Sequence, residues 1–251
     1  MICDDTKRMM IDYYKPIPDV EFLTDKIPVS EPSGETLVYL DDLFVCDSKY
    51  YRWAEMDGAA LPGSSPSIMC RKTVCEMLKR AEALLPEGYR FVIFDAYRPI
   101  SVQQALWDHF RAQKAKEFPD ASPVEIDRQT QFCVSLPSYD VLLPSLHNTG
   151  GAVDLTIAGP DGRELDMGCE FDEFTGRAWT VYYEDGSEGA GLNDAARDNR
   201  RLLYNVMTSA GFTNFPAEWL HFDYGDEKWA LYTGRSPIYA GILDARVRNS
   251  V

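Results

Sequence analysis

Two short segments hold the residue types of a hydrolytic zinc site. Residues 145–154 read Ser-Leu-His-Asn-Thr-Gly-Gly-Ala-Val-Asp, and residues 218–221 read Glu-Trp-Leu-His. A catalytic zinc ion needs about three protein ligands, a water in the open position and a base that takes the proton of that water. The candidate ligands are His147, Asp154 and His221, and the candidate base is Glu218. The chain has three histidines and two of them fall in these segments, so chance is a poor explanation.

The sequence around His147 allows two ligands to converge. His147 precedes a tight turn, Asn148–Gly151, that leads into a strand over residues 152–157. Apolar and polar residues alternate along this strand, which presents Asp154 from its polar face, and His221 arrives from a distant strand. Imidazole and carboxylate ligands suit zinc, whereas a softer site would have used the available cysteines. The alternative is a hydrogen-bonded core histidine beside a surface aspartate.

Glu218 needs a particular backbone geometry to act as the base. It precedes His221 by three residues, and on a regular strand those two side chains point to opposite faces. Pro216 indicates a turn or bulge at the entrance of the strand, from which the Glu218 carboxylate could reach a metal-bound water. The carboxylate could take the proton of that water and deliver it to a leaving amine. The alternative is a solvated surface carboxylate.

Arg98 is a candidate for stabilising negative charge on the substrate. It follows a predicted strand over residues 89–97. When water attacks a peptide carbonyl an oxyanion forms, and a fixed guanidinium in a dry pocket stabilises it strongly. The alternative for Arg98 is a structural salt bridge with a carboxylate such as Asp95.

These segments resemble those of the D-alanyl-D-alanine dipeptidases, the VanX-type branch of the M15 zinc peptidases. The family pattern Ser-x-His-x-x-Gly-x-Ala-x-Asp is matched by residues 145–154, and its Glu-x-x-His element by residues 218–221. Further similarity covers residues 95–99, 167–172 and 221–226, so the resemblance spans about residues 35 to 235. Leu220 is a departure, since the family more often carries a second tryptophan there.

The resemblance implies a role for each matched residue. His147, Asp154 and His221 would hold one Zn²⁺ ion per chain, Glu218 would be the general base and acid, and Arg98 would steady the tetrahedral intermediate. A dipeptidase binds both ends of its substrate, so Asp172 would bind the free ammonium, and Ser145 with nearby backbone N–H groups would bind the free carboxylate. The alternatives are a turn-stabilising hydroxyl for Ser145 and one more charge in an acidic loop for Asp172.

The helices that position these residues can be predicted from hydrophobic periodicity. Apolar residues recur with helical spacing over residues 71–85. Ser101 and Gln104 predict a capping box that opens a second helix. Asn193 predicts the cap of a third helix that continues through Ala210.

The order of elements favours an α+β fold. Residues 219–224 predict a last strand, and helices and strands do not alternate strictly as in a parallel doubly wound sheet. We expect a single domain over residues 1–251 with a central, mainly antiparallel sheet flanked by helices, similar to hedgehog and DD-peptidase folds. A loop insertion of short elements is expected around residues 117–144, where prolines interrupt the sequence.

The composition limits the class of partner. Apolar residues make up 45% and charged residues 26%, as in soluble globular proteins. The net charge of −15 repels nucleic-acid phosphates and anionic lipids, so we expect neither nucleic-acid nor membrane partners. The six cysteines form no Cys-x-x-Cys pair, and no secretory signal or membrane span is visible. These features predict reduced thiols and a cytoplasmic protein, and they leave the oligomeric state open.

The leading hypothesis is a zinc dipeptidase that hydrolyses D-Ala-D-Ala or a similar small dipeptide. A first alternative is a D,D-carboxypeptidase or peptidoglycan endopeptidase that uses the same zinc site on longer peptides. A second alternative is a binding module that keeps the zinc and has lost catalysis. The presence of Glu218 and Arg98 argues against the second alternative, because a binding module needs no base.

Overall fold

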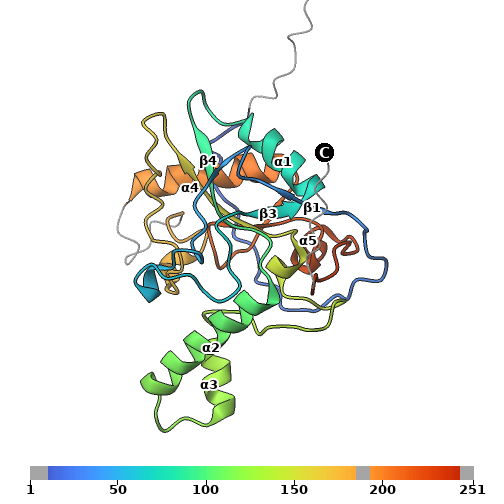
Figure 1. Ribbon diagram of the computed structural model, residues 1–251. Coiled ribbons are helices and arrows are strands. Elements are labelled where there is room, and N and C mark those ends of the chain that lie inside the picture. Colours follow the sequence, from blue (N-terminus) through green and yellow to red (C-terminus); the bar gives the residue numbers. More distant parts are fainter. Residues whose placement is uncertain (1–10, 185–192, 244–251) are drawn as a thin grey trace, which may run out of the picture.

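A five-stranded mixed sheet runs through the structure, a computed structural model that describes residues 11–184 and 193–243 (Figure 1). Its strands, in spatial order, are β2 (Val45–Cys46), β4 (Arg90–Asp95), β5 (Val153–Ala158), β7 (His221–Asp223) and β6 (Thr213–Asn214). The first pair is parallel and the other neighbours are antiparallel. The expected α+β class with a mainly antiparallel sheet is confirmed.

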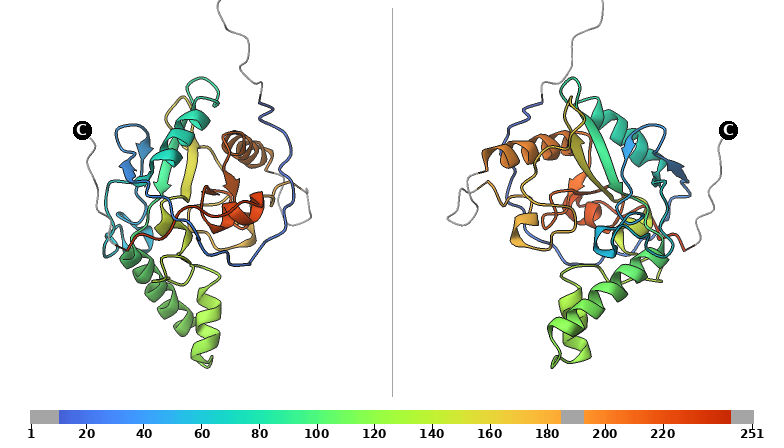
Figure 2. Two further views of the ribbon diagram at one scale, coloured as in Figure 1. Left: turned by 90° about the vertical axis from the view of Figure 1, so that its right-hand side faces the viewer. Right: turned by 60° about the vertical axis from the view of Figure 1, so that its left-hand side comes forward.

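Two helices cover one face of this sheet, α1 (Lys72–Glu82) and α4 (Asp194–Ser209) (Figure 2). Their apolar sides pack in the main core against the residues of β5 that face them, which are Val153, Leu155 and Ile157. Because side chains alternate along a strand, Asp154 lies on the opposite face of β5. The core thus fixes which sheet face can carry a polar site.

The start of α4 confirms the predicted cap, whereas the start of α2 does not. The Asn193 side chain accepts a hydrogen bond from the Ala196 N–H. Helix α2 (Ile100–Glu117) begins before Ser101, with Pro99 at the cap position. Ser101 therefore lies inside the first turn, and the predicted capping box is wrong.

A pair of helices projects from the body between residues 100 and 130 (Figures 1 and 2). Helix α3 (Pro123–Thr130) packs against α2 within the region expected to hold loops and short elements. The Ser122 hydroxyl accepts from the Glu125 N–H, and Pro123 stands in the first turn, where a missing N–H costs nothing. In this region, therefore, Pro123 begins a helix rather than interrupting one.

The remaining elements complete the frame. They are β1 (Leu37–Tyr39) paired with β3 (Met69–Arg71), the short 3₁₀ helices η1 (Ala54–Met56), η2 (Leu146–Thr149) and η3 (Gly176–Ala178), and α5 (Glu227–Thr233). Residues 11–36 run over the body without a helix or strand and are held by backbone bonds such as Val29 N–H to Leu142 O at 2.9 Å. Within the described ranges, no helix has the length and apolar character needed to cross a membrane.

Candidate metal centre

The three candidate ligands reach one point from a turn and two neighbouring strands. His147 lies in η2, and Gly150 ends that helix with a φ of +74°, which glycine adopts without steric cost. The chain then enters β5, whose second residue is Asp154. Asp154 pairs directly with His221 in the register of β5 and β7. Local turn chemistry therefore brings two ligands together, and strand pairing adds the third.

The donor atoms of these residues have the spacing that a tetrahedral ion requires. His147 Nε2 lies 3.2 Å from Asp154 Oδ2 and 3.2 Å from His221 Nδ1. His221 Nδ1 lies 3.0 Å from Asp154 Oδ1. Ligand atoms about 2.0–2.1 Å from a tetrahedral zinc ion stand roughly 3.3 Å apart. All three side chains are buried.

Hydrogen bonds on the outer side of each imidazole fix which nitrogen faces inward. His147 Nδ1 lies 2.9 Å from the carbonyl oxygen of Ala96, which can only accept, so the lone pair of Nε2 faces the other ligands. His221 Nε2 lies 2.7 Å from Asp223 Oδ1 and leaves Nδ1 facing inward in the same way. Asp154 Oδ1 is buried and has no hydrogen-bond partner among the described residues. These inward-facing acceptors fit a metal cation.

The charges around the ligands favour a positive charge between them. Burial opposes ionisation of Asp154, but the imidazoles of His147 and His221 outweigh it and lower the pKa of the Asp154 carboxyl. Burial also works against protonation of His221, and the carboxylates of Asp223 and Asp154 outweigh it and raise its pKa. A proton satisfies this arrangement, and a metal cation would take its place.

Glu218 lies in the turn that leads into β7. Its N–H donates to Phe215 O at 2.9 Å, and the His221 N–H donates back to Glu218 O at 3.3 Å. This turn lets the Glu218 carboxylate come within 3.8 Å of His221 Nδ1, which a regular strand would not allow. Burial and the negative charge of Asp154 raise the pKa of Glu218 against the opposing effect of His221. The side chain keeps 43% of its surface exposed, so the carboxylate remains reachable by substrate.

Arg98 forms the expected salt bridge and also reaches the ligands. Its Nε donates to Asp95 Oδ2 at 2.8 Å and its Nη1 to Gln103 Oε1 at 2.9 Å. Its Nη2 donates to the Tyr50 hydroxyl at 3.2 Å and lies 3.7 Å from Asp154 Oδ2. Arg98 is only 7% exposed, so its partners hold the guanidinium rigidly beside the three candidate ligands.

Asp172 lies near the candidate ligands, and the Tyr50 hydroxyl links it to Arg98. The Tyr50 hydroxyl donates to Asp172 Oδ1 and the Trp53 indole N–H donates to Oδ2, each at 3.3 Å. Burial raises the pKa of Asp172 to about 8; Arg98 opposes the shift, and Asp154 adds to it. Asp172 also has a φ of +57°, an uncommon conformation for a residue other than glycine. This carboxyl is therefore hydrogen-bonded and desolvated near the candidate ligands, and the alternative of one more solvated charge in an acidic loop does not describe it.

Ser145 immediately precedes η2 and is 8% exposed. Its hydroxyl does not cap that helix, and within the described part of the chain its Oγ has no hydrogen-bond partner. The turn-stabilising role considered for Ser145 is thus not observed. A buried hydroxyl without a partner is available to bind a ligand.

Several residues of the site were not assigned from the sequence. The sequence predicts no role in the site for Tyr50, Trp53, Gln103 or Asp223. The spacing of His221 and Asp223 carried a usable signal, because residues two apart on a strand share a face and a ligating imidazole needs an outer partner. No local pattern indicated Gln103, which lies five residues after Arg98, or Tyr50, which reaches Arg98 through tertiary packing.

Comparison with known proteins agrees with this geometry. A family model of the M15 peptidases, described as D-ala-D-ala dipeptidase, matches residues 37–240, which include every candidate site residue. The chain belongs to this family. The D-Ala-D-Ala dipeptidase family is one of metallopeptidases, and the clustered histidine and aspartate side chains are a candidate metal site.

Relatives of the same family align over most of the chain. The D-alanyl-D-alanine dipeptidase of Synechocystis sp. is 32% identical over 84% of this chain and 90% of its own length. That of Escherichia coli is 30% identical over 70% of this chain and 76% of its own length. A solved structure described as VanYB in complex with D-Alanine-D-Alanine covers 68% of this chain and 82% of its own, with a TM-score of 0.39 and 15% identity. That structural similarity is too low to support an inference.

Proposed function

We propose that this protein is a zinc-dependent dipeptidase that hydrolyses D-Ala-D-Ala or a similar small dipeptide. The observation that carries the proposal is the placement of Glu218 Oε2 3.8 Å from His221 Nδ1, beside three mutually adjacent ligand atoms. His147, Asp154 and His221 would hold the zinc ion. When bound, zinc would polarise the substrate carbonyl and make a water molecule more acidic.

Glu218 is proposed as the general base and then the general acid. Its raised pKa makes the carboxylate a better proton acceptor than that of an ordinary glutamate. Glu218 would take a proton from the attacking water and deliver it to the leaving amine. The distance of 3.8 Å from Glu218 Oε2 to His221 Nδ1 supports this role.

Arg98 is proposed to stabilise the oxyanion that forms as water attacks the peptide carbonyl. Its bonds to Asp95 and Gln103 hold the guanidinium before substrate arrives, so no reorganisation is needed as the negative charge develops. Its proximity to Asp154 places this positive charge beside the metal ligands.

Asp172 and Ser145 are proposed to recognise the two ends of the dipeptide. A substrate ammonium would pair with the Asp172 carboxylate and lower its raised pKa. The unpaired Ser145 hydroxyl would donate to the substrate carboxylate, together with nearby backbone N–H groups. An enzyme that recognises both ends in this way is restricted to short, unblocked peptides.

The surroundings of Asp172 favour a dipeptidase over the D,D-carboxypeptidase or endopeptidase alternative. An acylated peptide has no ammonium to balance an ionised, desolvated Asp172. The geometry of Glu218 likewise favours catalysis over a binding module that retains only the metal.

The test is hydrolysis of D-Ala-D-Ala, L-Ala-L-Ala and N-acetyl-D-Ala-D-Ala by zinc-loaded and chelator-treated protein. The proposal predicts zinc-dependent cleavage of the free D,D-dipeptide and at most weak cleavage of the other two. Cleavage of the acetylated peptide would identify a carboxypeptidase. Tight zinc binding without cleavage of any peptide would identify a binding module.

A cytoplasmic location and one zinc ion per chain complete the proposal. The cysteines among the described residues are Cys46, Cys70, Cys75, Cys133 and Cys169, and all are free thiols. Free thiols are usual in a reducing compartment, which supports the proposed location. Zinc content per chain can be measured on the purified protein by elemental analysis.

A further inference from the structure

Arg200, in the middle of α4, is a buried cation whose partners are carbonyl groups. It is 2% exposed and forms no ion pair within the described ranges of the chain. Its guanidinium donates at 2.8 Å to three carbonyl oxygens, those of Met167, Arg177 and Trp179. Nη2 also lies 3.4 Å from Cys169 Sγ. A buried charge is costly unless its hydrogen bonds are satisfied, so Arg200 and the backbone around it require each other.

The backbone held by Arg200 is the segment that carries Asp172. Arg200 binds this segment, residues 167–179, at both of its ends. The Tyr183 hydroxyl adds a bond to Gly168 O at 2.8 Å. Between the fixed ends, Asp172 takes its left-handed conformation, which persists only where the surrounding structure enforces it.

The end of this segment and the next residue, Thr180, also fix the backbone on either side of Glu218. The Trp219 N–H donates to Ala178 O at 2.9 Å, and the Thr180 N–H donates to Pro216 O at 3.0 Å. Arg200 binds Trp179 O, the carbonyl between these two contacts. The turn that carries Glu218 is therefore fastened to the segment that Arg200 holds.

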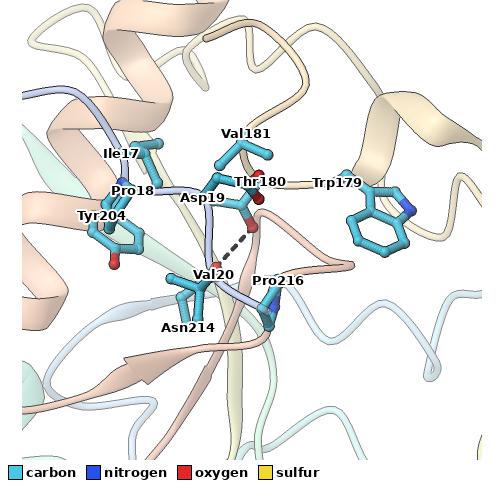
Figure 3. A pocket seen from close by; sticks show the side chains of 10 residues that line it. All are labelled: Ile17, Pro18, Asp19, Val20, Trp179, Thr180, Val181, Tyr204, Asn214 and Pro216. Atoms are coloured by element: carbon cyan, nitrogen blue, oxygen red, sulfur yellow. Dashed lines mark hydrogen bonds between the residues drawn. The ribbon is translucent and has the colours of Figure 1, made fainter. Parts of the chain in front are cut away.

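A side-chain relay strengthens this attachment. The Thr180 hydroxyl donates to Asn214 Oδ1 at 2.7 Å, the dashed bond in Figure 3. Asn214 Nδ2 in turn donates to the carbonyl oxygens of Glu218, at 3.1 Å, and His221, at 3.0 Å. The small hollow in Figure 3 lies beside this relay, and none of the proposed catalytic, metal-binding or substrate-binding side chains lines it.

We propose that Arg200 is a positioning residue that sets both the ammonium-binding carboxyl of Asp172 and the base Glu218 relative to the metal ligands. This inference rests on the proposed function. His147 and Asp154 are held separately by η2 and β5, and His221, although Asn214 also binds its carbonyl, is held by the pairing of β7 with β5. Zinc affinity should therefore depend little on Arg200, while catalysis depends on it strongly.

The test compares Arg200→Lys with Arg201→Lys. Lysine keeps the charge at position 200, but its single ammonium cannot reproduce the fork that reaches three carbonyls. Arg201 lies next on the same helix, pairs with Glu184 and makes no bond to residues 167–179, so its replacement is a matched control. A misplacement of about 1 Å can cost a reaction roughly 100-fold. We expect Arg200→Lys to lower kcat/KM by about that factor, through a lower kcat and a higher KM, while zinc affinity and kcat/KM of the control each stay within about 3-fold of wild type.

Hydrogen exchange gives a readout that needs no activity. If Arg200 holds the segment, the Thr180 and Trp219 amides should exchange at least ~10-fold faster in Arg200→Lys than in wild type or Arg201→Lys, because local opening becomes easier. Unchanged exchange at both amides, or an unchanged kcat/KM, would overturn the inference. An equal loss of activity in Arg201→Lys would also overturn it, by showing that general destabilisation is responsible. An inactive wild-type protein would refute the proposed function, and the exchange rates would still decide whether Arg200 holds the segment.

Discussion

The hydrogen bond between His221 and Asp223 should contribute measurably to zinc affinity. It is 2.7 Å long and joins two side chains that are 4% and 0% exposed, so water cannot replace it easily. A buried hydrogen bond to a charged group contributes roughly 1.5–3 kcal/mol. At about 1.4 kcal/mol per tenfold change, Asp223→Ala should weaken zinc binding roughly 10- to 100-fold. Asp223→Asn keeps an acceptor oxygen and should lose about 10-fold or less.

Zinc affinity should be measured by competition with a chromophoric chelator, with circular dichroism to show that each variant is folded. Asp154→Asn serves as the comparison, because it alters a proposed direct ligand and should weaken binding more than either change at Asp223. If folded Asp223→Ala binds zinc within about 2-fold of wild type, the orientation of His221 does not depend on Asp223. That result would refute the reasoning from the outer hydrogen bond.

Three further predictions concern the proposed catalytic groups. Glu218→Gln should retain zinc and fold while kcat falls by about 10²–10⁴-fold, as expected when a positioned base is lost. Arg98→Lys should lower kcat by about 10²–10³-fold, because lysine cannot keep the bonds to Asp95 and Gln103 while facing the oxyanion. For Asp172, with a pKa raised from 3.8 to about 8, KM should fall as pH rises toward 8, because the substrate ammonium requires the carboxylate. Over the same range the free energy of unfolding should decrease with pH, because the folded state keeps a proton that the unfolded chain has released.

Each of these predictions has a result that would contradict it. Glu218→Gln with wild-type kcat would remove Glu218 from the proton transfer, and Arg98→Lys with wild-type kcat would remove Arg98 from oxyanion binding. In Asp172→Asn, KM should depend less on pH. The free energy of unfolding should also lose the pH dependence that Asp172 contributes. An unchanged pH dependence in that variant would show that another group titrates.

The fold was predictable where local chemistry and periodicity agree. The apolar face of α1 and the Asn193 cap of α4 have local signals, and the structure confirms both. The start of α2 was predicted wrongly because a serine with a glutamine three residues later matches a capping box even where the preceding proline takes the cap position. Helix α3 gave a mixed signal, since its proline can either begin a helix or end one.

For the site, the sequence by itself predicted which residues could be ligands and that Glu218 must lie in a turn, and the structure brings the three candidates together. Residue types and short spacings fix which atoms can bind a metal, because donor chemistry is a property of the side chain. Only the tertiary structure decided which nitrogen of each imidazole faces inward, and only it placed Tyr50 and Arg200. Those features depend on partners far apart in the chain. These partners become neighbours only when β5 pairs with β7 and when residues 167–179 bind Arg200 of α4. Local patterns contain no information about contacts at such separations, so packing decides them.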